Sequence, residues 1–194
     1  PGLPPLGIRM IAPCTIPVSP RAAARAAALE AVVPRLTTPR TILRAPRLTD
    51  YDALHSITGS ARNSFEGGPS TPEESWADFC GMTATWLLRG HGMWTVETRA
   101  GDVAGFVLIG CEPGDREHEL GWLMCDAFEG LGLASEAAQA ARGHGWTDLN
   151  LPSLVSYIAP GNTRSEAVAT RLGAAPDGTL YGGQIVVWRH RRPT

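Results

Sequence analysis

The stretch Phe128–Trp146 reads FEGLGLASEAAQAARGHGW, and our interpretation of the whole chain begins from it. It follows an apolar run that ends at Cys125, and it places Gly130 and Gly132 directly before an alanine-rich segment. This order predicts a strand, a glycine-rich loop and then a helix. The first N–H groups of a helix have no partner within the helix, and glycines allow a ligand to approach the backbone closely. We therefore expect this loop to bind an oxyanion, most naturally a phosphate or pyrophosphate.

Two common nucleotide-binding loops do not match this stretch. A P-loop requires Lys and then Ser or Thr after its second glycine, whereas Leu133 and Ala134 stand there. A Rossmann loop requires a third glycine in an early βαβ unit, whereas this loop follows the fourth predicted strand. The loop carries Glu129 and Leu131 but no cation of its own. A pyrophosphate bound there would depend on backbone N–H groups and on the helix dipole.

The rest of the pattern predicts an α+β (mixed α/β) fold with a mostly antiparallel sheet. Alternating apolar residues between turn signals predict strands at residues 41–47, 92–101, 103–114, 116–125, 153–159 and 182–191. Helical periodicity predicts further helices at residues 21–33, 49–57, 70–88 and 163–173. We expect Thr49 to cap the helix at 49–57, and Ser70 or Thr71 to cap the next helix, with Pro72 in its first turn.

Composition limits the possible partners and the compartment. The formal net charge of -2 gives no general attraction to nucleic acid or to an anionic membrane. The four cysteines form no CxxC pair and no His pair has metal-ligand spacing, so we expect free thiols, no metal and a cytoplasmic protein. Residues 1–37, rich in Pro, Ala and Arg, are expected to form an N-terminal extension, and residues 38–194 the folded domain.

Three segments resemble the GNAT superfamily of N-acetyltransferases. Glu129–Ala134 resembles its Q/R-x-x-G-x-G/A acetyl-CoA loop, and Ala159–Ala174 (APGNTRSEAVATRLGA) is similar to its N-x-x-S segment before a Leu-Gly pair. Thr38–Leu54 resembles the opening of the RimJ/RimL-like branch. The resemblance covers roughly residues 38–190. It implies a sheet of about six or seven strands, split between strands four and five, flanked by about four helices, with acetyl-CoA in the split.

The resemblance also implies the cofactor contacts. The backbone of the fourth strand would pair with the pantetheine arm, the loop would hold the pyrophosphate, and an Asn amide would contact the cofactor nearby. The cofactor-binding residues expected on this basis are Trp122, Leu123, Met124, Glu129, Gly130, Leu131, Gly132, Leu133, Ala134, Ser135, Asn162 and Ser165.

Acetylation of an amine requires a general base, because the attacking nitrogen must lose a proton. Glu119 occupies the place where the family commonly has a carboxylate base, and we rank Glu117 second and His118 third. Ala169 stands where many members have a Tyr that protonates the leaving thiolate. By analogy with the RimL-like branch, Ser165 would take that part.

The sequence thus predicts an acetyl-CoA-dependent N-acetyltransferase in which an amine attacks the thioester directly, without a metal. The acceptor is expected to be a protein or peptide α-amine, with a small amine such as an antibiotic or a polyamine as the alternative. A non-catalytic acyl-CoA-binding module remains a rival. No nucleic-acid or membrane partner is expected, and the sequence leaves open whether the chain is a monomer or a homodimer.

Overall fold

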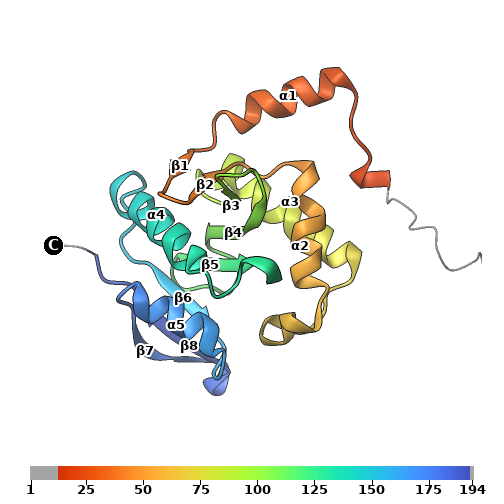
Figure 1. Cartoon of the computed structure of the whole chain (residues 1–194). Helices are drawn as coiled ribbons and strands as arrows, with labels where there is room; N and C mark the ends of the chain where they lie inside the picture. The colour runs from red at the N-terminus through yellow and green to blue at the C-terminus, as the bar shows by residue number, and fades with distance from the viewer. Residues whose placement is uncertain (1–12, 193–194) are drawn as a thin grey trace, which may run out of the picture.

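The computed structural model describes residues 13–192 as one eight-stranded mixed sheet flanked by helices (Figure 1). The expectation of an irregular, proline-rich start falls largely on residues 1–12, which lie outside the described residues. The strands lie side by side in the order β1-β2-β3-β4-β5-β6-β8-β7. They are β1 (Leu36–Thr37), β2 (Thr41–Arg44), β3 (Met93–Thr98), β4 (Val103–Gly110), β5 (Glu119–Met124), β6 (Val155–Ile158), β7 (Ala175–Leu180) and β8 (Ile185–Arg189).

Five α-helices and five short 3-10 helices connect these strands in the described part of the chain. The α-helices are α1 (Pro20–Glu30), α2 (Tyr51–Thr58), α3 (Pro72–Arg89), α4 (Leu133–Thr147) and α5 (Thr163–Arg171). The 3-10 helices are η1 (Pro13–Thr15), η2 (Leu48–Asp50), η3 (Ala61–Glu66), η4 (Asp126–Phe128) and η5 (Tyr181–Gly183). The mixed α/β class is confirmed.

Two details differ from the sequence expectation. Thr49 lies inside η2, and Asp50 rather than Thr49 precedes α2. The strand β7 was not predicted, because its sequence APDGTL contains Pro, Asp and Gly, which are depleted in strands. At the next helix the expectation holds: the Thr71 hydroxyl accepts the Glu74 N–H and the Glu74 carboxylate accepts the Thr71 N–H, in a capping box before α3.

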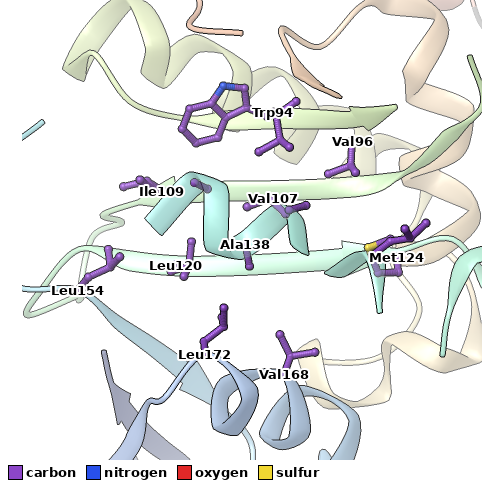
Figure 2. Close-up of a cluster of buried hydrophobic side chains, with 14 of the residues drawn as sticks. Trp94, Val96, Val107, Ile109, Leu120, Met124, Ala138, Leu154, Val168 and Leu172 are labelled. Atoms are coloured by element: carbon purple, nitrogen blue, oxygen red, sulfur yellow. The ribbon is translucent and has the colours of Figure 1, made fainter. Parts of the chain in front are cut away.

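The sheet is covered on both faces. On one face α4 packs through fully buried alanines, Ala137, Ala138 and Ala141, and Figure 2 shows Ala138 beside the sheet side chains of Val107 and Leu120. On the other face α2 and α3 enclose a second cluster around Phe106 of β4. The small side chains let α4 lie close to the strands, and this packing holds the first turn of α4 in position on the sheet.

The sheet opens between β5 and β6. β5 pairs with β4 along its whole length, from Glu119 opposite Gly110 to Met124 opposite Gly105. With β6 it shares a single parallel register pair, Glu119 with Val155. The expected split between the strands at 116–125 and 153–159 is therefore confirmed. These strands are the fifth and sixth in the structure because the two-residue strand β1 precedes the others.

The N-terminal segment meets the body before Thr38. α1 has no buried residue and lies apart from the sheet at the top of Figure 1. The contacts of this segment with the body include the ion pair of Glu30 with Arg47, the Pro34 carbonyl that accepts the Trp94 indole N–H at 2.8 Å, and the pairing of β1 with β2. No helix in the described residues is both long and apolar enough to cross a membrane.

The buried ion pairs of Arg44 lead to a prediction about stability. The Arg44 guanidinium, 8% exposed, donates to Asp50 at 2.7 Å and to Glu97 at 2.6 Å. Asp50→Ala would leave Arg44 short of a buried partner, so we expect it to lower the free energy of unfolding by about 3–5 kcal/mol in urea titrations. Glu30→Ala, which removes the more exposed pair with Arg47, should cost less than about 1 kcal/mol. Equal effects of the two variants would contradict this ranking.

Candidate active site

The glycine loop before α4 has the backbone geometry that only glycine adopts easily. Gly130 and Gly132 have φ angles of 70° and 77°, in the left-handed region. Gly132 is the N-cap residue of α4, and no side chain caps the helix. The first N–H groups of α4 are therefore free to meet an anion. Arg40 holds the loop from outside: it donates to the Leu131 carbonyl at 2.8 Å and pairs with Glu136 at 2.6 Å.

The loop forms one wall of a cleft of about 600 Å³ that runs along the sheet opening. η3, β5, the start of α4 and the start of α5 form the other walls. All of the residues expected to bind the cofactor line this cleft, although they come from three separate segments of the sequence. They are Trp122, Leu123, Met124, Glu129, Gly130, Leu131, Gly132, Leu133, Ala134, Ser135, Asn162 and Ser165.

One atom in this cleft lacks a partner that its chemistry requires. The Ser135 hydroxyl, in the first turn of α4, is buried without a hydrogen-bond partner. Buried hydroxyls are normally paired, so an orphan at the edge of a cleft is a place where a ligand oxygen would fit. The group implied by the resemblance, a CoA pyrophosphate followed by an amide-bearing arm, supplies such oxygens. The residues present therefore fit that group.

The open edge of β5 presents backbone groups to the cleft. Backbone groups alternate sides along a strand, and the His118 carbonyl accepts the Val155 N–H on the β6 side. The Leu120 carbonyl also faces this side, where it accepts the Ser156 hydroxyl at 2.6 Å. By the same alternation, the backbone groups of Trp122 and Met124 face the opening. They are free to pair with an extended, amide-bearing ligand.

Asn162 and Ser165 lie across the opening from β5, at the start of α5. The Asn162 side-chain oxygen accepts the Ser165 N–H at 3.3 Å, so Asn162 is the N-cap of α5. This use of the oxygen leaves the Asn162 amide NH₂ available to the cleft. The Ser165 side chain lines the cleft and also a second cavity beyond it.

Two arginines, Arg62 and Arg164, lie beside the loop. Arg62 of η3 pairs with Asp126 at 2.7 Å and also with Glu129. Arg164 of α5 pairs with the other Glu129 oxygen at 2.8 Å. Arg62 and Arg164 both line the cleft. The expectation that an anion here depends on backbone groups alone is therefore incomplete. Arg164 stands next to the Asn162 motif, but nothing in the sequence around Arg62 marks it.

The three candidate bases have different surroundings. Burial, together with the charges of Asp115 and Glu66, raises the pKa of Glu119 to about 8. The Arg189 guanidinium accounts for most of the lowering of the Glu117 pKa to about 2, and the two groups form an ion pair at 2.7 Å. Burial lowers the pKa of His118, whose ring packs edge-on against His91. Of these three, Glu119 is the one that lines either of the two cavities.

The second cavity, of about 570 Å³, lies between η3, α3, β4 and β5. We call it the acceptor cavity. It shares five lining residues with the cleft, Asn63, Glu66, Trp122, Leu123 and Ser165, and it carries Glu119 on the β5 side. The two cavities therefore meet along β5, with Ser165 lining both and Glu119 lining the acceptor cavity.

Comparison with known proteins gives a consistent family. The acetyltransferase (GNAT) domain family matches residues 40–175. The uncharacterized N-acetyltransferase YnaD of Bacillus subtilis strain 168 is 32% identical over 65 residues, which are 34% of this chain and 38% of that protein. The alignment thus spans less than half the length of this curated relative.

Solved structures match over most of the chain. An acetyltransferase from Agrobacterium tumefaciens strain C58 is 36% identical, with a TM-score of 0.78 over 82% of this chain and 95% of that chain. RimL, a ribosomal L7/L12 α-N-protein acetyltransferase, shares the fold at 21% identity, with a TM-score of 0.65 over 82% of this chain and 94% of its own.

The pairing of Glu129 leads to a prediction about CoA. Removing its charge should tighten CoA binding, because the phosphates would no longer face a carboxylate and both arginines would be released. We expect Glu129→Gln to lower the Kd about two- to five-fold, from about 0.5–1 kcal/mol of relieved repulsion at low salt. Arg164→Gln should raise the Kd by a similar factor. Both effects should fade as salt rises, which titration calorimetry at two ionic strengths would measure.

The matched control is Arg21→Gln, on the exposed helix α1, which should leave CoA binding unchanged at either salt concentration. If Glu129→Gln weakened binding instead, the carboxylate would matter more for positioning Arg62 and Arg164 than for repelling phosphate.

Proposed function

Because the chain belongs to the GNAT acetyltransferase family, we propose that it transfers an acetyl group from acetyl-CoA to a primary amine. The observation that carries this proposal is the meeting of the two cavities. One begins at the glycine loop, the other contains Glu119, and residues that line both include Trp122, Leu123 and Ser165. A binding module would need the first cavity but has no evident use for a carboxylate in the second.

We assign the binding roles as follows. The N–H groups of the loop and of the first turn of α4 bind the pyrophosphate, with Arg62 and Arg164 beside it. The backbone groups of Trp122 and Met124 pair with the pantetheine arm in the manner of an added strand. The Ser135 hydroxyl, which lacks a partner, gains one from the ligand. Bound acetyl-CoA supplies an acetyl carbon activated as a thioester.

We assign the chemical step to Glu119 and Ser165. The amine nitrogen forms a bond to the acetyl carbon, the carbon–sulfur bond breaks, and its electron pair leaves on sulfur. The Glu119 carboxylate accepts the proton that the nitrogen loses, directly or through a water. The Ser165 hydroxyl, at the shared boundary of the cavities, donates a hydrogen bond or a proton to the sulfur. The products are an acetamide and the CoA thiol.

For the acceptor we propose a protein or peptide α-amine, on the resemblance of residues 38–54 to the RimJ/RimL-like branch. A small amine is the alternative, and both require the same junction of cavities. We also propose a cytoplasmic location. The four cysteines are free thiols in the structure, as is usual in a reducing compartment.

The proposed function predicts that acetyl-CoA raises the melting temperature. A ligand that binds only the folded state at 100 times its Kd adds about 2.7 kcal/mol to the free energy of unfolding. Differential scanning fluorimetry with acetyl-CoA, and with inorganic pyrophosphate as the control for the loop alone, would measure this. Absence of any shift at millimolar acetyl-CoA would overturn the proposed function.

The proposed role of Glu119 also predicts how kcat depends on pH. The pKa of about 8 means that the carboxyl group is largely protonated at neutral pH. With an acceptor whose own ionisation is known, kcat should therefore rise towards pH 8 and level off above it. Glu119→Gln should lower kcat by about 10²–10⁴-fold and remove that inflection, with little change in the KM for acetyl-CoA.

Glu117→Gln is the matched control, because it changes the neighbouring carboxylate that pairs with Arg189. It should keep the inflection near pH 8. An inflection that survives Glu119→Gln and disappears in Glu117→Gln would transfer the role of base to Glu117.

A further inference from the structure

The acceptor cavity is lined by acidic side chains and by no basic ones. Of its lining residues, four are acidic, and none is Arg, Lys or His. The acidic residues come from four different places in the chain: the end of η3, the middle of α3, the connection between β4 and β5, and the first residue of β5. They are Glu66, Asp78, Glu112 and Glu119.

These carboxylates have no cationic partner within the described part of the chain. The ion pairs there use other acids, such as Glu129 with Arg164 and Glu117 with Arg189. The whole chain carries a net charge of only -2. The unpaired acids therefore give this cavity a negative lining, and a concave surface of one sign raises the local concentration of counter-charged ligands.

These acidic groups raise one another's pKa values. Burial first, and then the charges of Asp115 and Asp78, raise the pKa of Glu112. Glu66 and Glu112 contribute to the raised pKa of Glu119, after burial and Asp115. Glu119 belongs to the proposed reaction centre and faces this cavity without a cation beside it. A positive ligand would relieve the repulsion among all of these groups.

A metal ion does not fit this arrangement. Among residues 13–192 no group of three or more His, Cys, Asp or Glu side chains is close enough together to hold one. The carboxylates are instead distributed around a cavity of about 570 Å³, a volume typical of pockets for small organic ligands. Such a distribution suits an extended molecule with more than one positive charge.

We propose that the acceptor carries a second positive charge in addition to the amine that is acetylated. Either a diamine or polyamine, or a peptide with a basic side chain close to its N-terminus, has this chemistry. The inference rests on the proposed function, because it takes the acceptor cavity as the place where the amine binds. Glu119 meets the reacting amine next to the cleft, and Glu66, Asp78 and Glu112 attract the second charge.

The size of the expected preference for a dication depends on how far these carboxylates are exposed to solvent. Glu66, Asp78 and Glu112 lose part of their hydration in the cavity but keep much of their surface in contact with solvent, so each attraction is screened. A screened pair of this kind changes an affinity only a few-fold, and three together should change it about ten-fold or more at low salt. The preference for a dication should therefore decline as the salt concentration rises.

The test compares acceptors that differ by one charge. Putrescine and butylamine have the same carbon chain, and a seryl-lysyl peptide differs from a seryl-glutaminyl peptide in one basic side chain. We expect kcat/KM at low salt to be at least about ten-fold higher for the dication of one pair, and to fall as salt increases. The pair that shows the preference identifies whether the source is a free polyamine or a peptide.

Variants connect the preference to the cavity. Asp78→Asn and Glu112→Gln should each lower kcat/KM for the dication about two- to five-fold and together about ten-fold, with no change for the monocation or in the KM for acetyl-CoA. Glu73→Gln, also on α3 but outside the cavity, is the matched control and should have no effect. Equal kcat/KM values for the monocation and the dication, together with no effect of Asp78→Asn or Glu112→Gln, would overturn the inference. The proposed function would still stand.

If none of the amines tested led to release of CoA from acetyl-CoA, the proposed function would fail. Calorimetry would then test the inference separately. Binding of putrescine or of the basic peptide in the presence of CoA, lost in the double variant Asp78→Asn with Glu112→Gln, would support a cation site. No binding by the unaltered protein would overturn it.

Discussion

The architecture of the site depends on the single register pair that joins β5 to β6, between Glu119 and Val155. The two strands are parallel and are connected through α4, and they pair only at their first residues. Once they separate, the backbone groups of Trp122 and Met124 lose the neighbours that a strand interior normally has. Backbone groups in that position need a partner from elsewhere. The cleft, the glycine loop and the start of α5 all lie along this opening.

The two cavities on either side of this junction differ in charge. Arg62 and Arg164 stand at the cleft, where the proposed ligand carries phosphates, whereas the acceptor cavity has carboxylates and no lining cation. Glu129 pairs with both arginines and so offsets part of their charge in the absence of a ligand. This separation disfavours the wrong ligand in each cavity, because a phosphate would meet carboxylates and an amine would meet guanidinium groups.

The sequence predicted what local signals encode. Gly130, Gly132 and the alanines of α4 form a strand–loop–helix pattern that hardly depends on the rest of the chain, whereas Asn162 and Ser165 were expected only from the resemblance to the GNAT superfamily. β7 was missed because its Pro and Gly argue against a strand, and pairing with β8 overrides that preference. Arg62 and Asp78 were also missed, since their positions at the cavities result from how η3 and α3 pack on the sheet rather than from any motif.

The environment of Glu119 connects the fold with the chemistry. An ordinary glutamate, with a pKa near 4.5, is a weak base towards an ammonium group, whose pKa is roughly 8 for an α-amine and roughly 10 for a side-chain amine. Burial beside other carboxylates raises the Glu119 pKa to about 8, which brings it close to that of the α-ammonium group that we propose it deprotonates. The same neighbouring carboxylates give the acceptor cavity its negative potential. One arrangement of acids therefore both attracts a cationic amine and makes Glu119 basic enough to take its proton.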